Sequence, residues 1–165
     1  MSAQRKALAC ELVALEAQLL DEQDWDAWLA LYTEDAQFWV PMWKDEKTLT
    51  SDPQRELSFV WLQGRQYLEE RVFRVASGRS VASNPVPRTA HLVAGSIATP
   101  DGEDGMAVKS AWSSHIYQHK EARLITYAGR YEHALAWTGE GFRIRRKKII
   151  LANDQLVSKV DFFYL

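Results

Sequence analysis

The stretch ELSFVWLQGRQYLEERVFRVASGRSVASNPVPRTAH, from Glu56 to His91, decides how this chain folds. Its first part, Leu57 to Leu62, is a short apolar run that predicts a strand. Gly64 breaks this run, and the pattern then predicts an amphipathic helix that starts at Arg65 and ends at Gly78. The apolar face of this helix recurs at i, i+4 and i+7 and consists of Leu68, Val72 and Val75.

The end of the stretch, SNPVPRTAH, contains two prolines, which disfavour both a regular helix and a central strand. We expect an extended, exposed segment here. It brings Arg88 and His91 to the start of the next strand.

Two helices are predicted before this stretch. Residues Ala3 to Leu20 form the first, with an apolar face at Leu8, Leu12, Leu15 and Leu19. Asp24 is suited to cap a second, shorter helix. That helix contains Trp25, Trp28, Leu29 and Tyr32, and Thr33-Glu34-Asp35 closes it. Ala36 to Val40 then predicts a strand that Pro41 stops, and Lys44 to Gln54 predicts a loop.

Long alternating strands are predicted after His91. They cover Leu92–Ala98, Met106–Tyr117, Ala122–Trp137 and Phe142–Ala152, with a hairpin turn at 138–141. In the last strand the apolar phase slips between Ile144 and Ile149, which predicts a bulge or a strand with a polar face near its middle.

Helices followed by a run of long antiparallel strands predict an α+β fold, in one domain over residues 1–165. The chain is 47% hydrophobic, has a formal net charge of −2, and has no apolar run near the ~20 residues that cross a bilayer. Glu11 and Glu16 interrupt the apolar N-terminal segment, so we read it as a mature helix and expect a cytoplasmic protein. The charge balance argues against nucleic-acid binding.

The order of strand, helix, RxASGRS turn, proline-rich segment and RTxH resembles the β (small) subunit of bacterial aromatic-ring-hydroxylating dioxygenases, the Rieske non-haem iron oxygenases. The resemblance includes DEQDWDAWLALYTEDAQFWVP and GEGFRIRRKKIILAND, so it covers most of the chain. The segment TSDPQRELS is most similar to the branch that acts on ortho-substituted benzoates such as anthranilate, halobenzoates or salicylate.

This resemblance implies a cone-shaped fold of the nuclear transport factor 2 type (NTF2-like or SnoaL-like), with helices packed against a strongly curved, mainly antiparallel sheet. It also implies a non-catalytic subunit in aromatic hydrocarbon catabolism that supports the assembly of α subunits, as α3β3. The α subunit would bind the [2Fe-2S] Rieske cluster and the mononuclear Fe(II). A ferredoxin or reductase would deliver the electrons for ring dihydroxylation.

The ligand count agrees with a subunit that has no cofactor of its own. A Rieske cluster needs two cysteines and two histidines, and Cys10 is the only cysteine. A mononuclear iron needs two histidines and a carboxylate. His115 and His119 lie roughly 13 Å apart on a strand, so we expect ordinary histidines there. We predict no catalytic, cofactor-binding or metal-binding residue in this chain.

Two alternatives remain open at this stage. The first is a free-standing isomerase or dehydratase of the same fold, and the second is a small-ligand-binding protein. Acid–base chemistry would need a residue that reaches the substrate proton with a suitable pKa. The candidates are Tyr32, Asp35, His91, Tyr131 and His133.

Two groups of basic residues are candidates for contacts with a partner. We expect the basic run from Arg143 to Lys148 to be a solvated strand face, with a contact to an acidic partner as the second interpretation. Arginine is enriched at interfaces because its planar guanidinium binds carboxylates bidentately. The predicted α-subunit interface set is Arg71, Arg74, Arg79, Arg88 and His91.

Overall fold

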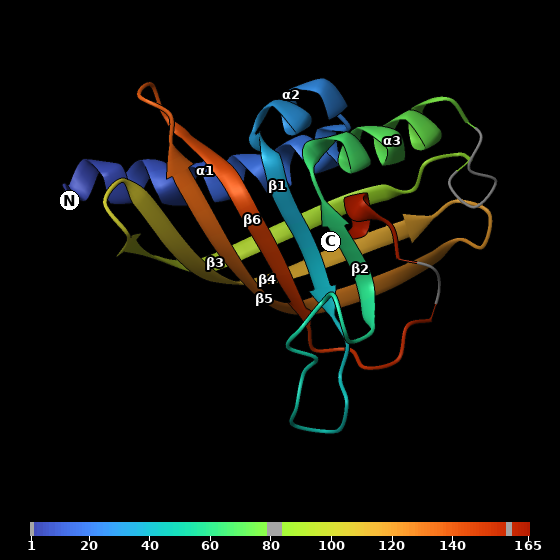
Figure 1. Ribbon diagram of the computed structural model, residues 1–165. Helices are drawn as coiled ribbons and strands as arrows, with labels where there is room; N and C mark the ends of the chain where they lie inside the picture. The colour runs from blue at the N-terminus through green and yellow to red at the C-terminus, as the bar shows by residue number, and fades with distance from the viewer. Residues whose placement is uncertain (1, 79–83, 158–159) are drawn as a thin grey trace.

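The computed structural model describes residues 2–78, 84–157 and 160–165, and it confirms the α+β prediction. Two helices of the described chain lie near its start and one between the second and third strands. These helices are α1 (Ala3–Glu22), α2 (Trp25–Ala30) and α3 (Arg65–Ala76). They lie together above one face of a curved sheet, as Figure 1 shows.

The caps of the two N-terminal helices follow from their sequence. The Ser2 side chain accepts from the Arg5 amide at 3.3 Å and starts α1. The Asp24 carboxylate accepts from the Ala27 amide at 3.2 Å and starts α2, as predicted. One boundary was wrong: residues 33–35 do not close α2, because the first strand already begins at Tyr32.

The apolar face predicted for α1 is confirmed only in part: Leu19 is buried and the partly buried Leu12 packs against the core, but the other two leucines do not. Leu8 and Leu15 are 40% and 42% exposed. The buried face consists instead of Ala9, Val13, Glu16, Ala17, Leu19 and Leu20. Small alanines let the helix backbone approach the sheet closely, so Leu8 and Leu15 lie at the margin of the contact. In α3 the prediction is confirmed, since Leu68, Val72 and Val75 are its buried residues.

The sheet has six strands in the order β2-β1-β6-β5-β4-β3, and β1 and β6 are its only parallel neighbours among the described residues. The strands are β1 (Tyr32–Pro41), β2 (Ser58–Gln63), β3 (Arg88–Asp101), β4 (Gly105–Gln118), β5 (Arg123–Trp137) and β6 (Phe142–Leu151). The sheet curves under the helices without closing into a barrel (Figure 1). None of the described helices combines the length and apolar character needed to cross a bilayer.

The long strands alternate as the sequence predicts. Val108, Trp112 and Ile116 of β4 and Tyr127 and Leu135 of β5 point into the core. The C-terminal 3-10 helix η2 (Phe162–Tyr164) is buried as well, inside the curve of the sheet (Figure 1). The molecule therefore closes its core with both ends of the described chain, since α1 and η2 pack on the same side of the sheet.

The phase slip predicted in the last strand is a bulge. Ala134 pairs with Arg146, whereas the next residue, Leu135, pairs with Ile144. One extra residue of β6, Arg145, is therefore accommodated between them. The bulge reverses the phase of the strand, so that Lys147 points into the core.

A substitution at Gly129 tests how tightly β5 and β6 are packed. A Cβ atom at this position would overlap the main-chain oxygen of Ile150. We expect Gly129→Ala to lower the free energy of unfolding by at least about 2 kcal/mol, because the neighbouring strand has to move. The corresponding fall in Tm is roughly 4–8 °C in thermal unfolding followed by circular dichroism. Gly141→Ala is the control, since a Cβ there meets no atom within 4 Å. Equal Tm values for the two variants would contradict this packing.

Candidate functional site

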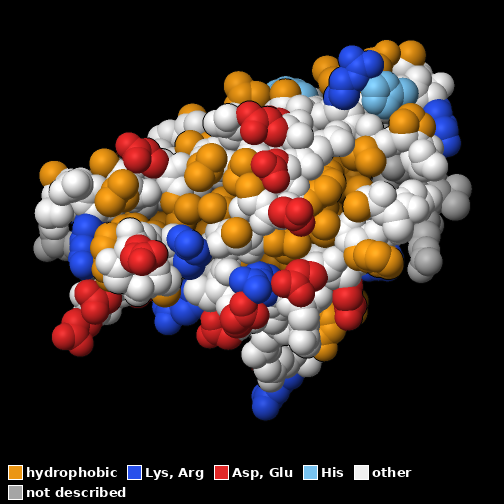
Figure 2. All heavy atoms as spheres, turned by 90° about the horizontal axis from the view of Figure 1, so that it is seen from above, with side chains coloured by type: hydrophobic (Ala, Val, Ile, Leu, Met, Phe, Trp, Pro, Cys, Tyr) orange, Lys and Arg blue, Asp and Glu red, His pale blue; other side chains and the backbone are white. Residues whose placement is uncertain are grey.

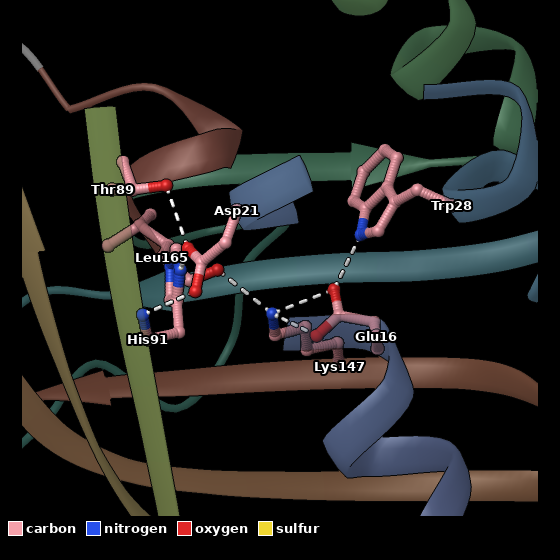
Figure 3. Close-up of polar contacts among 7 residues, drawn as sticks. All are labelled: Glu16, Asp21, Trp28, Thr89, His91, Lys147 and Leu165. Atoms are coloured by element: carbon pink, nitrogen blue, oxygen red, sulfur yellow. Dashed lines mark hydrogen bonds and ion pairs between the residues drawn. The ribbon is translucent and has the colours of Figure 1, made fainter. Parts of the chain in front are cut away.

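A buried ion pair joins α1 to β6 at the centre of the fold (Figure 3). The Lys147 ammonium donates to both carboxylate oxygens of Glu16, at 2.8 and 3.0 Å, and both side chains are 0% exposed. The same ammonium donates to the main-chain oxygen of Leu165 at 2.9 Å. The pair therefore fixes the N-terminal helix, the last strand and the C-terminal segment relative to one another.

Two aromatic side chains complete the hydrogen bonding of Glu16. The Trp28 indole N–H and the Tyr32 hydroxyl donate to Oε1 at 2.7 and 2.8 Å. Lys147 also lies over the Tyr131 ring, 4.5 Å from its centroid. A buried ion pair is tolerated when its remaining hydrogen-bonding groups are satisfied. These partners meet that condition.

The pKa of each member of the pair is shifted by burial and by its partner. Burial alone would raise the pKa of Glu16, but the charge of Lys147, together with the smaller effects of His133 and the hydrogen bonds from Lys147 and Trp28, outweighs burial and lowers it. The pKa of Lys147 is also lowered, because burial disfavours the ammonium more than Glu16 favours it. A lowered pKa favours the ionised form of Glu16 but the neutral form of Lys147. We assign the ionised state, because both charged groups have direct partners on every side.

A second polar cluster connects the end of α1 to the start of β3 (Figure 3). The Asp21 carboxylate accepts from the Thr89 hydroxyl and the His91 amide, both at 2.8 Å, and lies 2.6 Å from His91 Nδ1. Burial would raise the pKa of Asp21, but the hydrogen bonds and charge of His91, together with the hydrogen bond from Thr89, outweigh burial and lower it. Asp21 thus holds His91 in place through both its ring and its main chain.

The five acid–base candidates do not form an accessible site. Tyr32, Tyr131 and His133 are at most 3% exposed, and the His91 side chain is 0% exposed. Asp35 lies apart from them, on the opposite face of β1 in a shallow polar groove with Arg145 and Arg146.

The pKa values of the buried candidates are unsuited to catalysis near neutral pH. Burial lowers the pKa of His133 to about 3, and burial raises that of Tyr131 well above its usual value. Neither the base His133 nor the acid Tyr131 is therefore matched to proton transfer in solution. Over residues 2–78, 84–157 and 160–165, no three His, Cys, Asp or Glu side chains converge as metal ligands would.

Four members of the predicted interface set lie in the described structure, and Arg79 lies outside it. Arg71 is half-buried with its Nη1 3.9 Å from Asp161, whereas Arg74 is exposed in the last turn of α3. Arg88 is exposed, with Nη2 3.4 Å from His119. The end of α3 and the start of β3 lie at the same end of the molecule (Figure 1), so Arg74 and Arg88 share that end.

The basic run in β6 corrects one expectation. Arg145 and Arg146 are exposed, but Lys147 belongs to the core, so the run is not one solvated face. Sequence reasoning missed both Glu16 and Lys147 as partners. The available signals were a carboxylate within the face formed by Val13, Ala17 and Leu20, and the phase slip before Lys147.

Comparison with known proteins gives consistent matches over nearly the whole chain. The family described as ring hydroxylating beta subunit matches residues 15–158. The small subunit of 2-halobenzoate 1,2-dioxygenase from Burkholderia cepacia is 37% identical over 150 residues, which are 91% of this chain and 90% of that protein. The small subunit of anthranilate 1,2-dioxygenase from Acinetobacter baylyi is 35% identical over 151 residues, 91% of each chain.

Solved structures support the same grouping and the cone-shaped fold. The β subunit of benzoate 1,2-dioxygenase from Burkholderia mallei has a TM-score of 0.78 at 32% identity, with 95% of each chain covered. An NTF2-like protein from Novosphingobium aromaticivorans has a TM-score of 0.62 at 17% identity, covering 92% of this chain and 84% of that one. The second likeness shows the fold alone, and it confirms the predicted fold class.

The Glu16–Lys147 pair predicts a large loss of stability when one partner is removed. We expect Lys147→Met to lower the free energy of unfolding by about 3–5 kcal/mol, because Glu16 stays buried without its cation. The double variant Glu16→Gln/Lys147→Met should recover much of this loss, since the amide oxygen still accepts from Trp28 and Tyr32 without a charge. Urea unfolding of the native protein, the single variant and the double variant measures these free energies. Lys148→Met, at the partly exposed neighbouring position, is the control and should change stability by less than about 1 kcal/mol. If the double variant had a lower free energy of unfolding than Lys147→Met alone, the charged pair would be contradicted.

His133 predicts a fall in stability between neutral and mildly acidic pH. Its folded pKa of about 3 lies below the ordinary histidine pKa of 6.5, so the unfolded chain binds a proton in this window and the folded chain does not. Stability due to this group is present above pH 6.5 and is lost as the pH falls, by roughly 2 kcal/mol at pH 5. The lowered pKa values of Glu16 and Asp21 act only at lower pH, where carboxylates titrate. Urea unfolding at pH 7.5 and pH 5 should show the fall in the native protein and a smaller fall in His133→Phe. Equal falls would exclude His133 as the cause.

Proposed function

The chain belongs to the family of ring hydroxylating beta subunits, and on that premise we propose that it is the structural small subunit of a terminal oxygenase that acts on an aromatic acid. The observation that carries the proposal is the 35–37% identity to small dioxygenase subunits over 91% of the chain. Small subunits belong to enzyme complexes, so the chain is part of an oxidoreductase. We infer that the complex is cytoplasmic.

The sealed interior supports a structural role. The titratable groups inside the fold either pair with one another or lie away from solvent. A Rieske cluster needs two cysteine ligands, and Cys10 is the only cysteine in the sequence. The redox centres of the proposed complex, a [2Fe-2S] cluster and a mononuclear Fe(II), therefore belong to the large subunit. This chain contributes stability and a binding surface to that partner.

The three relatives named above act on 2-halobenzoate, anthranilate and benzoate according to their names. Each of these compounds is a carboxylic acid attached to an aromatic ring. We propose the same substrate class here, selected by the large subunit, with an ortho substituent as the narrower expectation.

The surface offers apolar side chains for such a partner. Seen from above the helices, hydrophobic side chains cover a broad area, with charged side chains both among them and around them (Figure 2). Exposed apolar residues of α1 and α3 are Leu8, Leu15, Tyr67 and Phe73, with 40–59% of each exposed. Apolar centres with charged rims are typical of subunit interfaces. We propose an α3β3 assembly in which the arginines at the ends of α3 and β3 contact the large subunit.

Co-expression with the large subunit of the same oxygenase tests this assignment. We expect a complex with three copies of each chain by native mass spectrometry, and ring dihydroxylation by the complex but not by this chain alone. Arg74→Glu and Arg88→Glu should each reduce the recovered complex at least several-fold, because a reversed charge at an interface repels its partner.

Arg55→Glu is the matched control. Its guanidinium is 87% exposed in the loop between β1 and β2, away from the proposed contact. Failure of the native chain to bind any large subunit would contradict the proposed function. Full complex formation by both arginine variants would contradict only the proposed contact.

A further inference from the structure

The inner faces of three strands carry buried polar atoms without a hydrogen-bond partner. Of eight such side-chain atoms in the described residues, only Arg71 Nε lies elsewhere. The other seven are His91 Nε2, Ser110 Oγ, Trp112 Nε1, Ser114 Oγ, Tyr131 Oη and both ring nitrogens of His133. They lie on β3, β4 and β5.

The pairing of the strands places these side chains in one continuous strip. His91 faces Ser114 across β3 and β4, and Ser110 faces Tyr131 across β4 and β5. Trp112 bridges the two pairs, because its ring stacks on Tyr131 with centroids 4.8 Å apart. His133 continues the strip, 5.4 Å from the Tyr131 ring centroid. We call these six residues the polar strip.

The polar strip is connected to both polar clusters of α1, because Lys147, the partner of Glu16, lies over the Tyr131 ring and His91 bonds to Asp21. The charges of both Glu16 and Asp21 act on the Tyr131 hydroxyl, after burial, to raise its pKa. The hydroxyl is therefore close enough to feel both carboxylates while bonding directly to neither. His91 uses Nδ1 for Asp21, so Nε2 is left to face the strip.

Buried polar groups without hydrogen-bond partners would lower the free energy of unfolding considerably. Each such group loses the hydrogen bonds that it makes to water in the unfolded chain, and the net stability of a domain is small compared with seven such losses. Native proteins satisfy buried groups of this kind with ordered water, about one molecule per 27 residues. By that measure a chain of 165 residues is expected to hold about six.

We propose that ordered water molecules bind along the polar strip and connect His91, Ser114, Tyr131 and His133. The set of groups favours water over other ligands. The Trp112 indole can only donate a hydrogen bond, whereas the serine and tyrosine hydroxyls can donate and accept. Among the described residues, no three His, Cys, Asp or Glu side chains come together as metal ligands would. Water satisfies both roles at the smallest size.

The substitutions Ser114→Ala and Tyr131→Phe test this proposal, because each removes one hydroxyl and little else. If water binds there, each variant leaves a bound molecule short of a partner, and Tm falls by roughly 2–4 °C. If the hydroxyls have no partner at all, the same substitutions remove a buried polar group and Tm rises or stays the same. The two accounts therefore predict opposite signs.

The controls lie on the outer face of the same strand. Ser113→Ala and Tyr117→Phe remove a serine and a tyrosine hydroxyl from positions of β4 that point away from α1. We expect no change in Tm for either variant. The double variant Ser114→Ala/Tyr131→Phe should lose less than the sum of the two single losses, because the hydroxyls share bound water. A high-resolution crystal structure should show water density between them.

Three results would overturn the proposal. The first is a Tm that is unchanged or raised in either inner-face variant. The second is a crystal structure with no density along the polar strip. The third is density or added mass, in native mass spectrometry, that belongs to a larger molecule. None of these results bears on whether the chain binds a large subunit, so the two proposals fail separately.

Discussion

The contact between Glu16 and Lys147 is the constraint on which the rest of this structure depends. It joins residues that are 131 positions apart and brings the main-chain oxygen of Leu165 to the same ammonium. Two charges in a core are tolerated only when their partners are already in place. Trp28 and Tyr32 have to be positioned at the same time, so α2 and the start of β1 become part of one arrangement. A single long-range contact thus fixes the relative position of elements from both ends of the chain.

This constraint also explains why the interior of the described structure is filled with side chains. In a curved sheet of this kind the concave face is the natural place for a ligand pocket. Here that space is filled by the buried face of α1, by η2 and by the aromatic side chains around the ion pair. Polar groups are present in number, but they hold one another or lie out of reach of a substrate. A filled interior of this kind agrees with a structural role in the family of ring hydroxylating beta subunits.

The sequence predicted what depends on local periodicity and missed what depends on distant partners. The face of α3 was predicted correctly because its apolar residues are also those that pack, namely Leu68, Val72 and Val75. The face of α1 was not, because Leu8 and Leu15 give the stronger periodic signal while Ala9 and Ala17 make the closer contact. Lys147 was assigned to solvent with its neighbours, since a lysine in a basic run is usually exposed. Its burial follows from a bulge and from a carboxylate on another element, and neither can be read from the run itself.

A rigid interior is well matched to a subunit whose role is to bind another chain. Association is weakened when side chains and loops have to be ordered on binding, so a surface held in place beforehand binds more tightly for the same contact area. The ion pair orders α1, and Asp21 orders the start of β3 through His91 and Thr89. Arg88 directly precedes Thr89 at that ordered end of β3, so the same contacts hold its backbone in place. The buried polar groups therefore act on function through position: they fix the frame from which the exposed side chains reach a neighbour.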